Sequence, residues 1–154
     1  MTGFSTPQGL FFEDYTVGNS ITSQGRTVTE SDVVQFAMLS GDWNPLHTDA
    51  HTARDTIYGE RIAHGMLVLS LATGLAERLG FMQDKVIGFM GLEWQFRAAV
   101  KIGDTVRVRA TVEETKVATR LGGGFVTLKV QILNQEDKVV QRGSWTVLVK
   151  SRTA

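Results

Sequence analysis

The sequence predicts an α+β fold in which an antiparallel β-sheet wraps around one long, buried helix. Residues 65–79 carry an almost unbroken run of apolar side chains over their first two turns, which is typical of a helix buried on every side. From about residue 86, apolar and polar residues alternate along several segments, as they do in strands that place one face on the core. One long helix and four or five such strands are most simply arranged as a sheet around the helix.

The length and composition are those of one globular domain. The chain has 154 residues, of which 42% are apolar and 21% charged, and this suits a single substantial core. Both prolines lie in the first third of the chain, and we find no repeat, low-complexity tract or linker. We therefore predict a single domain over residues 1–154.

The charge and cysteine counts exclude several classes of function. Sixteen basic and sixteen acidic residues give a net charge of zero, so we expect no nucleic-acid partner, which usually needs a basic patch. The absence of cysteine excludes disulfides, thiol catalysis and zinc–thiolate sites. The N-terminal residues lack a signal-peptide pattern, and no segment has the roughly 20 apolar residues that cross a bilayer. We expect a cytoplasmic protein without a membrane partner.

The first elements along the chain are a strand and an amphipathic helix. A strand is predicted near residues 19–28. The helix follows in "TESDVVQFAMLSGD", where Thr29 is a plausible N-cap with Asp32 in the capping-box position. Gly41 is a natural C-terminal stop for this helix.

Two further helices are predicted in the middle of the chain. The segment "TDAHTARDT" has the pattern of a short helix capped by Thr48. The longer helix spans residues 65–79, and only Glu77 and Arg78 near its end indicate solvent. We expect the rest of its surface to be buried.

The last part of the chain is predicted to be an antiparallel meander. Turns are indicated by "KIGD" at residues 101–104 and by "NQEDK" at residues 134–138. The alternating apolar residues, expected on the dry face, are Trp94, Phe96, Ala98 and Val100; Val106, Val108, Ala110 and Val112; Val126, Leu128, Val130 and Ile132; and Trp145, Val147 and Val149. One helix against a sheet leaves strand edges open, and dimerisation by edge pairing is one remedy.

The stretch "SGDWNPLHTDA" at residues 40–50 carries most of the candidate chemistry. On a continuous helix, Asp42 and His47 would face roughly 140° apart. Pro45 would break such a helix, so we predict a loop that can bring the acid and the imidazole together. A carboxylate beside an imidazole can hold a water molecule and move its proton, with Asn44 orienting one of them. The alternative is that these residues only form a turn.

A second element is the pair His64–Gly65 at the start of the long helix. The first N–H groups of a helix lack helical partners and lie at the positive end of its dipole. Because Gly65 has no side chain, a substrate carbonyl could approach its N–H, which would then act as an oxyanion donor. A plain helix-start glycine is the alternative, and we assign His64 no role as an acid or base.

Two other kinds of site, a zinc site and a phosphate loop, are less favoured by the sequence. His47 and His51, with nearby acidic residues, have the i, i+4 spacing of a zinc site, but a cap at Thr48 would place His47 outside the helix. The acidic residues of such a site would be Asp42, Asp49 and Asp55. "GGGF" at residues 122–125 lacks the Gly-Lys-Ser/Thr ending of a phosphate loop and is interpreted as a strand connection.

The motif "FAMLSGDWNPLHTDAHTA" resembles the hydratase-2 motif, G-D-x-N-P-[LIV]-H, of the MaoC-like (R)-specific enoyl-CoA hydratases. The match is complete at Gly41, Asp42, Asn44, Pro45, Leu46 and His47. "RIAHGMLVLSLATGLA" is similar to the helix that follows in the family, and "WQFRAAVKIGDTVRVRATV" to its aromatic strand and hairpin. The resemblance extends over most of residues 10–150. It implies the hot-dog fold and a homodimer or dimer of dimers.

The resemblance also implies a reaction and its residues. Water would add syn to a trans-2-enoyl thioester of coenzyme A or acyl carrier protein, giving an (R)-3-hydroxyacyl product. Asp42 and His47 would activate the water and carry the Cα proton, and the Gly65 N–H would stabilise the enolate oxygen. No metal or other cofactor is implied. Ser70, Leu71 and Thr73 on the long helix are candidate walls of the acyl slot, although a tightly packed core would show the same residues.

Several related functions stay open at this point. The same dyad would serve a 3-hydroxyacyl-carrier-protein dehydratase, or a hydratase of branched or dicarboxylic acyl-CoA with an arginine in its pocket. A basic rim around the pocket could come from Arg97, Arg107, Arg109 and Lys116, unless these charges form a solvated face. A thioesterase is less favoured, because the long helix has an acidic residue only at Glu77. A non-catalytic acyl-thioester-binding protein is the remaining alternative.

Overall fold

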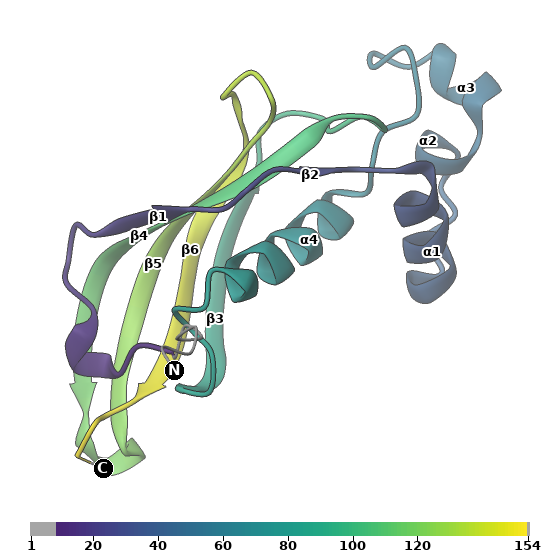
Figure 1. Cartoon of the computed structure of the whole chain (residues 1–154). Coiled ribbons are helices and arrows are strands. Elements are labelled where there is room, and N and C mark those ends of the chain that lie inside the picture. Colours follow the sequence, from purple (N-terminus) through teal and green to yellow (C-terminus); the bar gives the residue numbers. More distant parts are fainter. Residues whose placement is uncertain (1–8, 154) are drawn as a thin grey trace, which may run out of the picture.

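A computed structural model describes residues 9–153 of the chain. Its elements are a six-stranded antiparallel sheet and a long helix, α4 (Gly65–Arg78), lying along the sheet (Figure 1). The strands are β1 (Ser20–Thr22), β2 (Arg26–Thr27), β3 (Val86–Phe96), β4 (Thr105–Ala118), β5 (Gly123–Leu133) and β6 (Val139–Lys150). The remaining elements are η1 (Phe12–Asp14), α1 (Glu30–Ser40), α2 (Pro45–Thr48), α3 (Ala50–Arg54) and η2 (Thr119–Leu121). The predicted α+β class is confirmed, whereas the ends of the predicted domain, residues 1–8 and 154, lie outside the described part.

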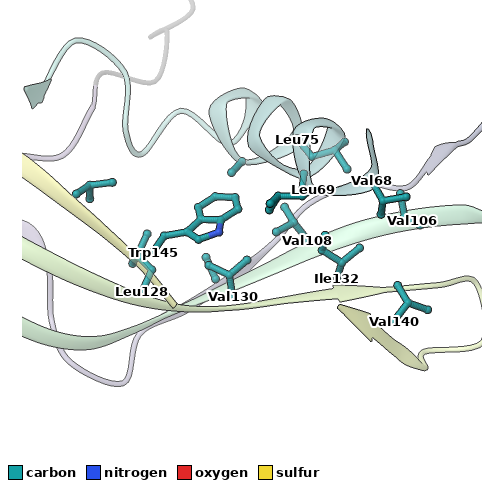
Figure 2. Packing of buried hydrophobic residues seen from close by; sticks show 14 of the residues in the cluster. Val68, Leu69, Leu75, Val106, Val108, Leu128, Val130, Ile132, Val140 and Trp145 are labelled. Carbon is teal, nitrogen blue, oxygen red and sulfur yellow. The ribbon is translucent and has the colours of Figure 1, made fainter. Parts of the chain in front are cut away.

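The sheet has the strand order β1-β4-β5-β6-β3, and β2 also pairs with β4. The alternation predicted for β4, β5 and β6 is confirmed, because their inward side chains are buried against α4. Figure 2 shows Val68, Leu69 and Leu75 of α4 facing these strands. Burying a leucine or valine contributes about 1.5–3 kcal/mol to folding, so this interface holds the sheet and helix together.

The predicted strand at residues 19–28 is divided into β1 and β2. Between them, the Val108 N–H donates to Ser23 Oγ (2.9 Å), while the Ser23 N–H donates to the Val108 carbonyl (2.8 Å). A side chain thus replaces a backbone acceptor at this point. The strand ladder is interrupted here although the chain stays beside β4.

The α1 helix has the ends that the sequence predicts. Thr29 Oγ1 accepts from the Asp32 N–H, and the Asp32 carboxylate accepts from the Thr29 N–H. Gly41 ends the helix in the left-handed conformation, with φ of 77°.

The region after Asp42 differs from the prediction. Asn44 caps a first short helix that was not predicted, since its side chain accepts from the Leu46 N–H, and Pro45 occupies the first helical position, where no backbone donor is needed. Asp49, not Thr48, caps the second short helix, which is the predicted one. His47 therefore lies within α2, and the Thr48 hydroxyl instead donates back to the carbonyls at positions 43 and 44.

The prediction that α4 is buried on every side is wrong for the single chain. Met66, Ser70, Thr73 and Glu77 form an exposed stripe along the helix. The apolar run indicated that the helix avoids water, but it did not indicate what would cover each face. Within residues 9–153, only the face toward the sheet is covered.

The dry face predicted for residues 94–100 is also incomplete. β3 ends at Phe96, whose side chain is 55% exposed, and Ala98 lies beyond the strand. Among the described residues β3 pairs with β6 alone, so β3 is an edge strand with two register shifts. None of the helices in residues 9–153 is long and apolar enough to span a membrane.

Candidate active site

The site lies where the short helices α1–α3 meet the N-terminal end of α4 (Figure 1). Asp42 follows the left-handed Gly41 and is held by a local turn. Its N–H donates to Ser40 Oγ (3.1 Å), and its carboxylate Oδ1 accepts from the Asn44 N–H (3.2 Å). The carboxylate is exposed and keeps its second oxygen for another partner.

His47 is presented by α2 with one ring nitrogen already engaged. Its Nδ1 lies 2.7 Å from the Ile62 carbonyl oxygen. A carbonyl can only accept, so Nδ1 carries the proton and Nε2 of the neutral ring has a free lone pair. The Ile62 N–H in turn donates to the Leu46 carbonyl (3.2 Å), which fixes α2 against the segment before α4.

His64 completes the cluster, although the sequence analysis assigns it no role as an acid or base. It is 2% exposed, and its ring stacks on His47 with centroids 3.9 Å apart. Its Nε2 lies 2.9 Å from the Asp42 carbonyl oxygen, so Nε2 is the protonated nitrogen. The one sequence feature that could have indicated a role for His64 was its position directly before Gly65, at the start of the buried helix.

The structure therefore brings the two residues of the predicted dyad together. A carboxylate oxygen of Asp42 and one nitrogen from each of His47 and His64 all lie within 4.8 Å of one another. Hydrogen bonds of up to about 3.0 Å to one water, at its tetrahedral angle, join atoms up to about 4.9 Å apart. One water molecule could therefore bridge the Asp42 carboxylate and a ring nitrogen of His47.

A metal ion fits this cluster poorly. The ring planes of His47 and His64 are stacked at 29° to one another with centroids 3.9 Å apart, so their in-plane lone pairs lie in separate, nearly parallel planes. Zinc requires nitrogen ligands that converge at about 2.0–2.1 Å. The histidine of the alternative metal set, His51, lies outside the cluster, and the Asp49 carboxylate caps α3.

Gly65 is the first residue of α4, and two contacts fix its place. A Cβ added to Gly65 would lie 2.7 Å from the Phe96 ring, so the close approach of this ring requires glycine. Gln141 Nε2 donates to the Gly65 carbonyl (3.0 Å), and Gln141 Oε1 accepts from Trp94 Nε1 (2.9 Å). Sequence reasoning missed Gln141. The available indication was that this polar residue lies two positions before Gly143 and four before Trp145, and so falls on the dry face of β6.

A cavity of about 600 Å³ opens beside these residues. His47, Gly65 and Gln141 line it together with mostly apolar side chains, including Ile62, Val68 and Phe96. A cavity of this size with a few polar groups at one end is typical of a small-molecule site.

Of the four basic residues predicted as a possible rim of the pocket, one lines the cavity. Arg97 lines the cavity and makes no ion pair within residues 9–153. Arg107 pairs with Asp137 elsewhere on the sheet, and Arg109 and Lys116 lie outside the lining. Arg61 instead links α1 to α2, because it pairs with Glu30 of α1 and donates to the carbonyl of His47 in α2 (3.4 Å).

The residues considered for substrate binding lie elsewhere in the single chain. Asn44 is exposed and uses its side-chain oxygen as the cap of α2. Ser70 and Thr73 are exposed on α4, and their hydroxyls donate to the carbonyls of Met66 and Ser70. Leu71 packs partly buried against the core. None of the four lines the cavity of the single chain.

Residues 14–134 match the family model for a MaoC like domain. The chain is 36% identical over 143 residues to the (R)-specific enoyl-CoA hydratase of Rhodospirillum rubrum, covering 92% of this chain and 93% of that protein. It is 41% identical over 112 residues to protein MaoC of Klebsiella aerogenes, covering 72% of this chain and 33% of that protein. The chain thus spans about a third of the Klebsiella protein.

Solved structures give the same relationship. The MaoC-like dehydratase from Rhodospirillum rubrum superposes with a TM-score of 0.80 and 28% identity, over 94% of this chain and 99% of that one. A Mycobacterium tuberculosis protein with a double hot-dog fold superposes with a TM-score of 0.82 at 18% identity, over 93% of this chain and 44% of that one, which shows the fold alone. The expected hot-dog fold is confirmed, and the chain belongs to the MaoC-like family of hydratases and dehydratases, which are hydro-lyases.

Proposed function

We propose that this protein is an (R)-specific enoyl-CoA hydratase that adds water reversibly to trans-2-enoyl thioesters. The observation that carries the proposal is that the Asp42 carboxylate and a ring nitrogen of His47 lie within 4.8 Å of one another, beside an apolar cavity that His47 and Gly65 line. This arrangement supports acid–base chemistry on a neutral substrate. It assigns no role to a metal or redox cofactor.

In the proposed reaction, one water molecule is held between Asp42 and His47. As its oxygen bonds to the thioester C3, one member of the dyad accepts a water proton and the electrons of the double bond shift to the carbonyl oxygen. The Gly65 N–H and the positive end of α4 stabilise the resulting enolate. The dyad then delivers a proton to C2. Since both transfers come from the same side of the substrate, addition is syn.

The proposed active form is a homodimer. β3 presents an unpaired edge with large exposed apolar side chains, and the α4 stripe beside it is uncovered in the single chain. Pairing of two copies along β3 would cover both features. In this arrangement Ser70, Leu71 and Thr73 would face a closed acyl slot, and Asn44 would act on the substrate only by shaping the turn that carries Asp42.

A second candidate is favoured by Arg97. A guanidinium without an ion-pair partner in the described part of the chain can bind a phosphate or a carboxylate at the cavity. It would suit the phosphates of coenzyme A, the phosphopantetheine of an acyl carrier protein, or the free carboxylate of a dicarboxylic acyl-CoA. The dehydratase direction on carrier-protein thioesters would use the same dyad.

The direct test is spectrophotometric hydration of crotonyl-CoA, with and without EDTA. Wild-type turnover that EDTA does not change is expected, and Asp42→Asn should lower kcat by about 10²–10⁴-fold, since it removes one acid–base group. Longer, branched and dicarboxylic enoyl-CoAs and a carrier-protein thioester would follow in the same assay. Binding of these thioesters without turnover of any would contradict the proposal and indicate a non-catalytic binding protein.

A further inference from the structure

We propose that His64 is a positioning residue, which holds the backbone of Asp42 and the ring of His47 in the arrangement that the reaction needs. The inference rests on the proposed function, because it concerns the same dyad. The proposed reaction uses none of the atoms of His64. Its role is to fix the two groups that do react.

The first contact fixes Asp42. The bonds that shape the Asp42 turn are local and involve the exposed residues Ser40 and Asn44, so they do not fix the turn against the rest of the molecule. The bond from His64 Nε2–H to the Asp42 carbonyl (2.9 Å) joins residues 22 positions apart in the chain. It is the link between this exposed turn and the buried start of α4.

The second contact fixes His47. The His64 ring stacks on His47, with centroids 3.9 Å apart, and also contacts Phe36, with centroids 4.9 Å apart and ring planes tilted by 57°. Phe36 packs against the hydrophobic core, so ring contacts lead from the core to the reacting imidazole. The Ile62 carbonyl holds Nδ1 of the same imidazole (2.7 Å). Stacking and this hydrogen bond together fix the direction of the Nε2 lone pair.

These contacts come from one short segment. Residues 62–65 supply a carbonyl to His47, a ring to both members of the dyad, and the Gly65 N–H. One backbone segment therefore fixes the relative positions of the acid, the base and the oxyanion donor. Such preorganisation matters because a misplacement of about 1 Å can lower a rate by about 100-fold.

The unpaired nitrogen of His64 argues against a purely structural role. With Nε2 protonated, Nδ1 is a lone-pair acceptor, and it is buried without a partner within residues 9–153. A buried acceptor without a partner destabilises a fold, and phenylalanine in this place would stack without that cost. The Asp42 carbonyl lies in an exposed turn and could bind water instead. Stability alone therefore does not favour histidine at position 64.

The test compares His64→Phe, which keeps the stack and removes the donor, with His64→Gln, whose amide N–H₂ can reach the Asp42 carbonyl. His64→Phe should lower kcat on an active enoyl thioester by about 30- to 100-fold, with KM within about threefold of wild type. Its Tm should not fall. His64→Gln should recover kcat to within about tenfold of wild type. The matched control is His51→Phe, at an exposed histidine outside the cluster, which should leave all three values unchanged.

A second readout does not depend on turnover. The chain has three histidines, so ¹⁵N NMR of uniformly labelled wild type, His51→Phe and His64→Phe assigns the three rings. Neutral His47 should carry its proton on Nδ1 and His64 on Nε2, and His64→Phe should shift the His47 ring and the Asp42 amide. Loss of wild-type turnover on every thioester, with these NMR results intact, would overturn the proposed function but not the placement. Unchanged kcat and unchanged His47 resonances in His64→Phe, or equal losses of kcat in both variants, would overturn the positioning role.

Discussion

At the residue scale, the missing side chain of Gly65 links packing to the proposed chemistry. An added Cβ would lie 2.7 Å from the Phe96 ring, which lines the same cavity. Because that ring is the end of a flexible side chain, it can move aside at small cost to folding. Its movement would change the wall of the cavity beside the proposed oxyanion donor.

Gly65→Ala should therefore lower kcat/KM by about 10- to 100-fold, below the loss of about 10²–10³-fold caused by complete removal of an oxyanion donor. The matched control is Gly74→Ala in the same helix, where an added Cβ meets nothing within 4 Å. This control should keep its activity and gain up to about 1 kcal/mol of stability. Steady-state kinetics and urea unfolding measure both effects, and equal activity of the two variants would contradict the role of Gly65.

At the scale of elements, α1 is stabilised at its start by charge and capping together. Arg26 forms two hydrogen bonds with the Asp32 carboxylate, of 3.0 and 2.9 Å, and Thr29 adds the capping box. The hydrogen bonds from Arg26, and then those from Thr29, lower the pKa of Asp32 below its usual range. A carboxyl whose pKa is lower in the folded state stabilises the fold above its unfolded pKa, and this stabilisation is lost as the pH falls through the folded pKa.

We expect Asp32→Asn to lower the free energy of unfolding at pH 7 by about 0.5–2 kcal/mol, which is the range for loss of a cap together with a partly exposed ion pair. The difference from wild type should begin to shrink below about pH 4, where Asp32 of the unfolded chain binds a proton, and it should vanish as the pH falls through the lower folded pKa. Urea unfolding at pH 7 and pH 3 provides the measurement. Glu114→Gln, at an exposed residue of β4 without an ion pair in the described part of the chain, is the control. A pH-independent difference would mean that the charge of Asp32 contributes nothing.

At the scale of the whole molecule, the uncovered surfaces lie together on one side of the fold. β3 is an edge strand, and its exposed apolar residues include Ile87, Phe89, Met90 and Leu92. A sheet edge with unpaired backbone groups and apolar side chains is a template for pairing with another chain. The proposed homodimer follows from this property.

Size-exclusion chromatography with light scattering should give about twice the chain mass of 16.9 kDa, or a multiple of that dimer. Met90→Glu should shift the protein toward the monomer and lower turnover, because it places a charge in the apolar pairing surface. Val117→Glu, at an exposed valine of β4, is the control and should remain a dimer. A monomeric wild type with full activity would exclude the dimer as the active form.

The sequence by itself determined the local elements. Capping by Thr29, the stop at Gly41 and the period of two in β4 and β5 depend on residues a few positions apart, so a linear pattern contains them. It also indicated that Asp42 and His47 could meet, because Pro45 forbids the continuous helix that would separate them. The assignment of a reaction to these residues came from the resemblance to a family, and the family is confirmed.

Tertiary structure alone decided how these elements combine. His64 lies 22 positions from Asp42, and Gln141 lies 76 positions from Gly65, so no local period indicates that they bond. Apolar composition indicated that α4 would be buried, yet the sheet covers only one of its faces. A hydrophobic pattern records how strongly a segment avoids water, whereas the packing of distant segments decides what covers it.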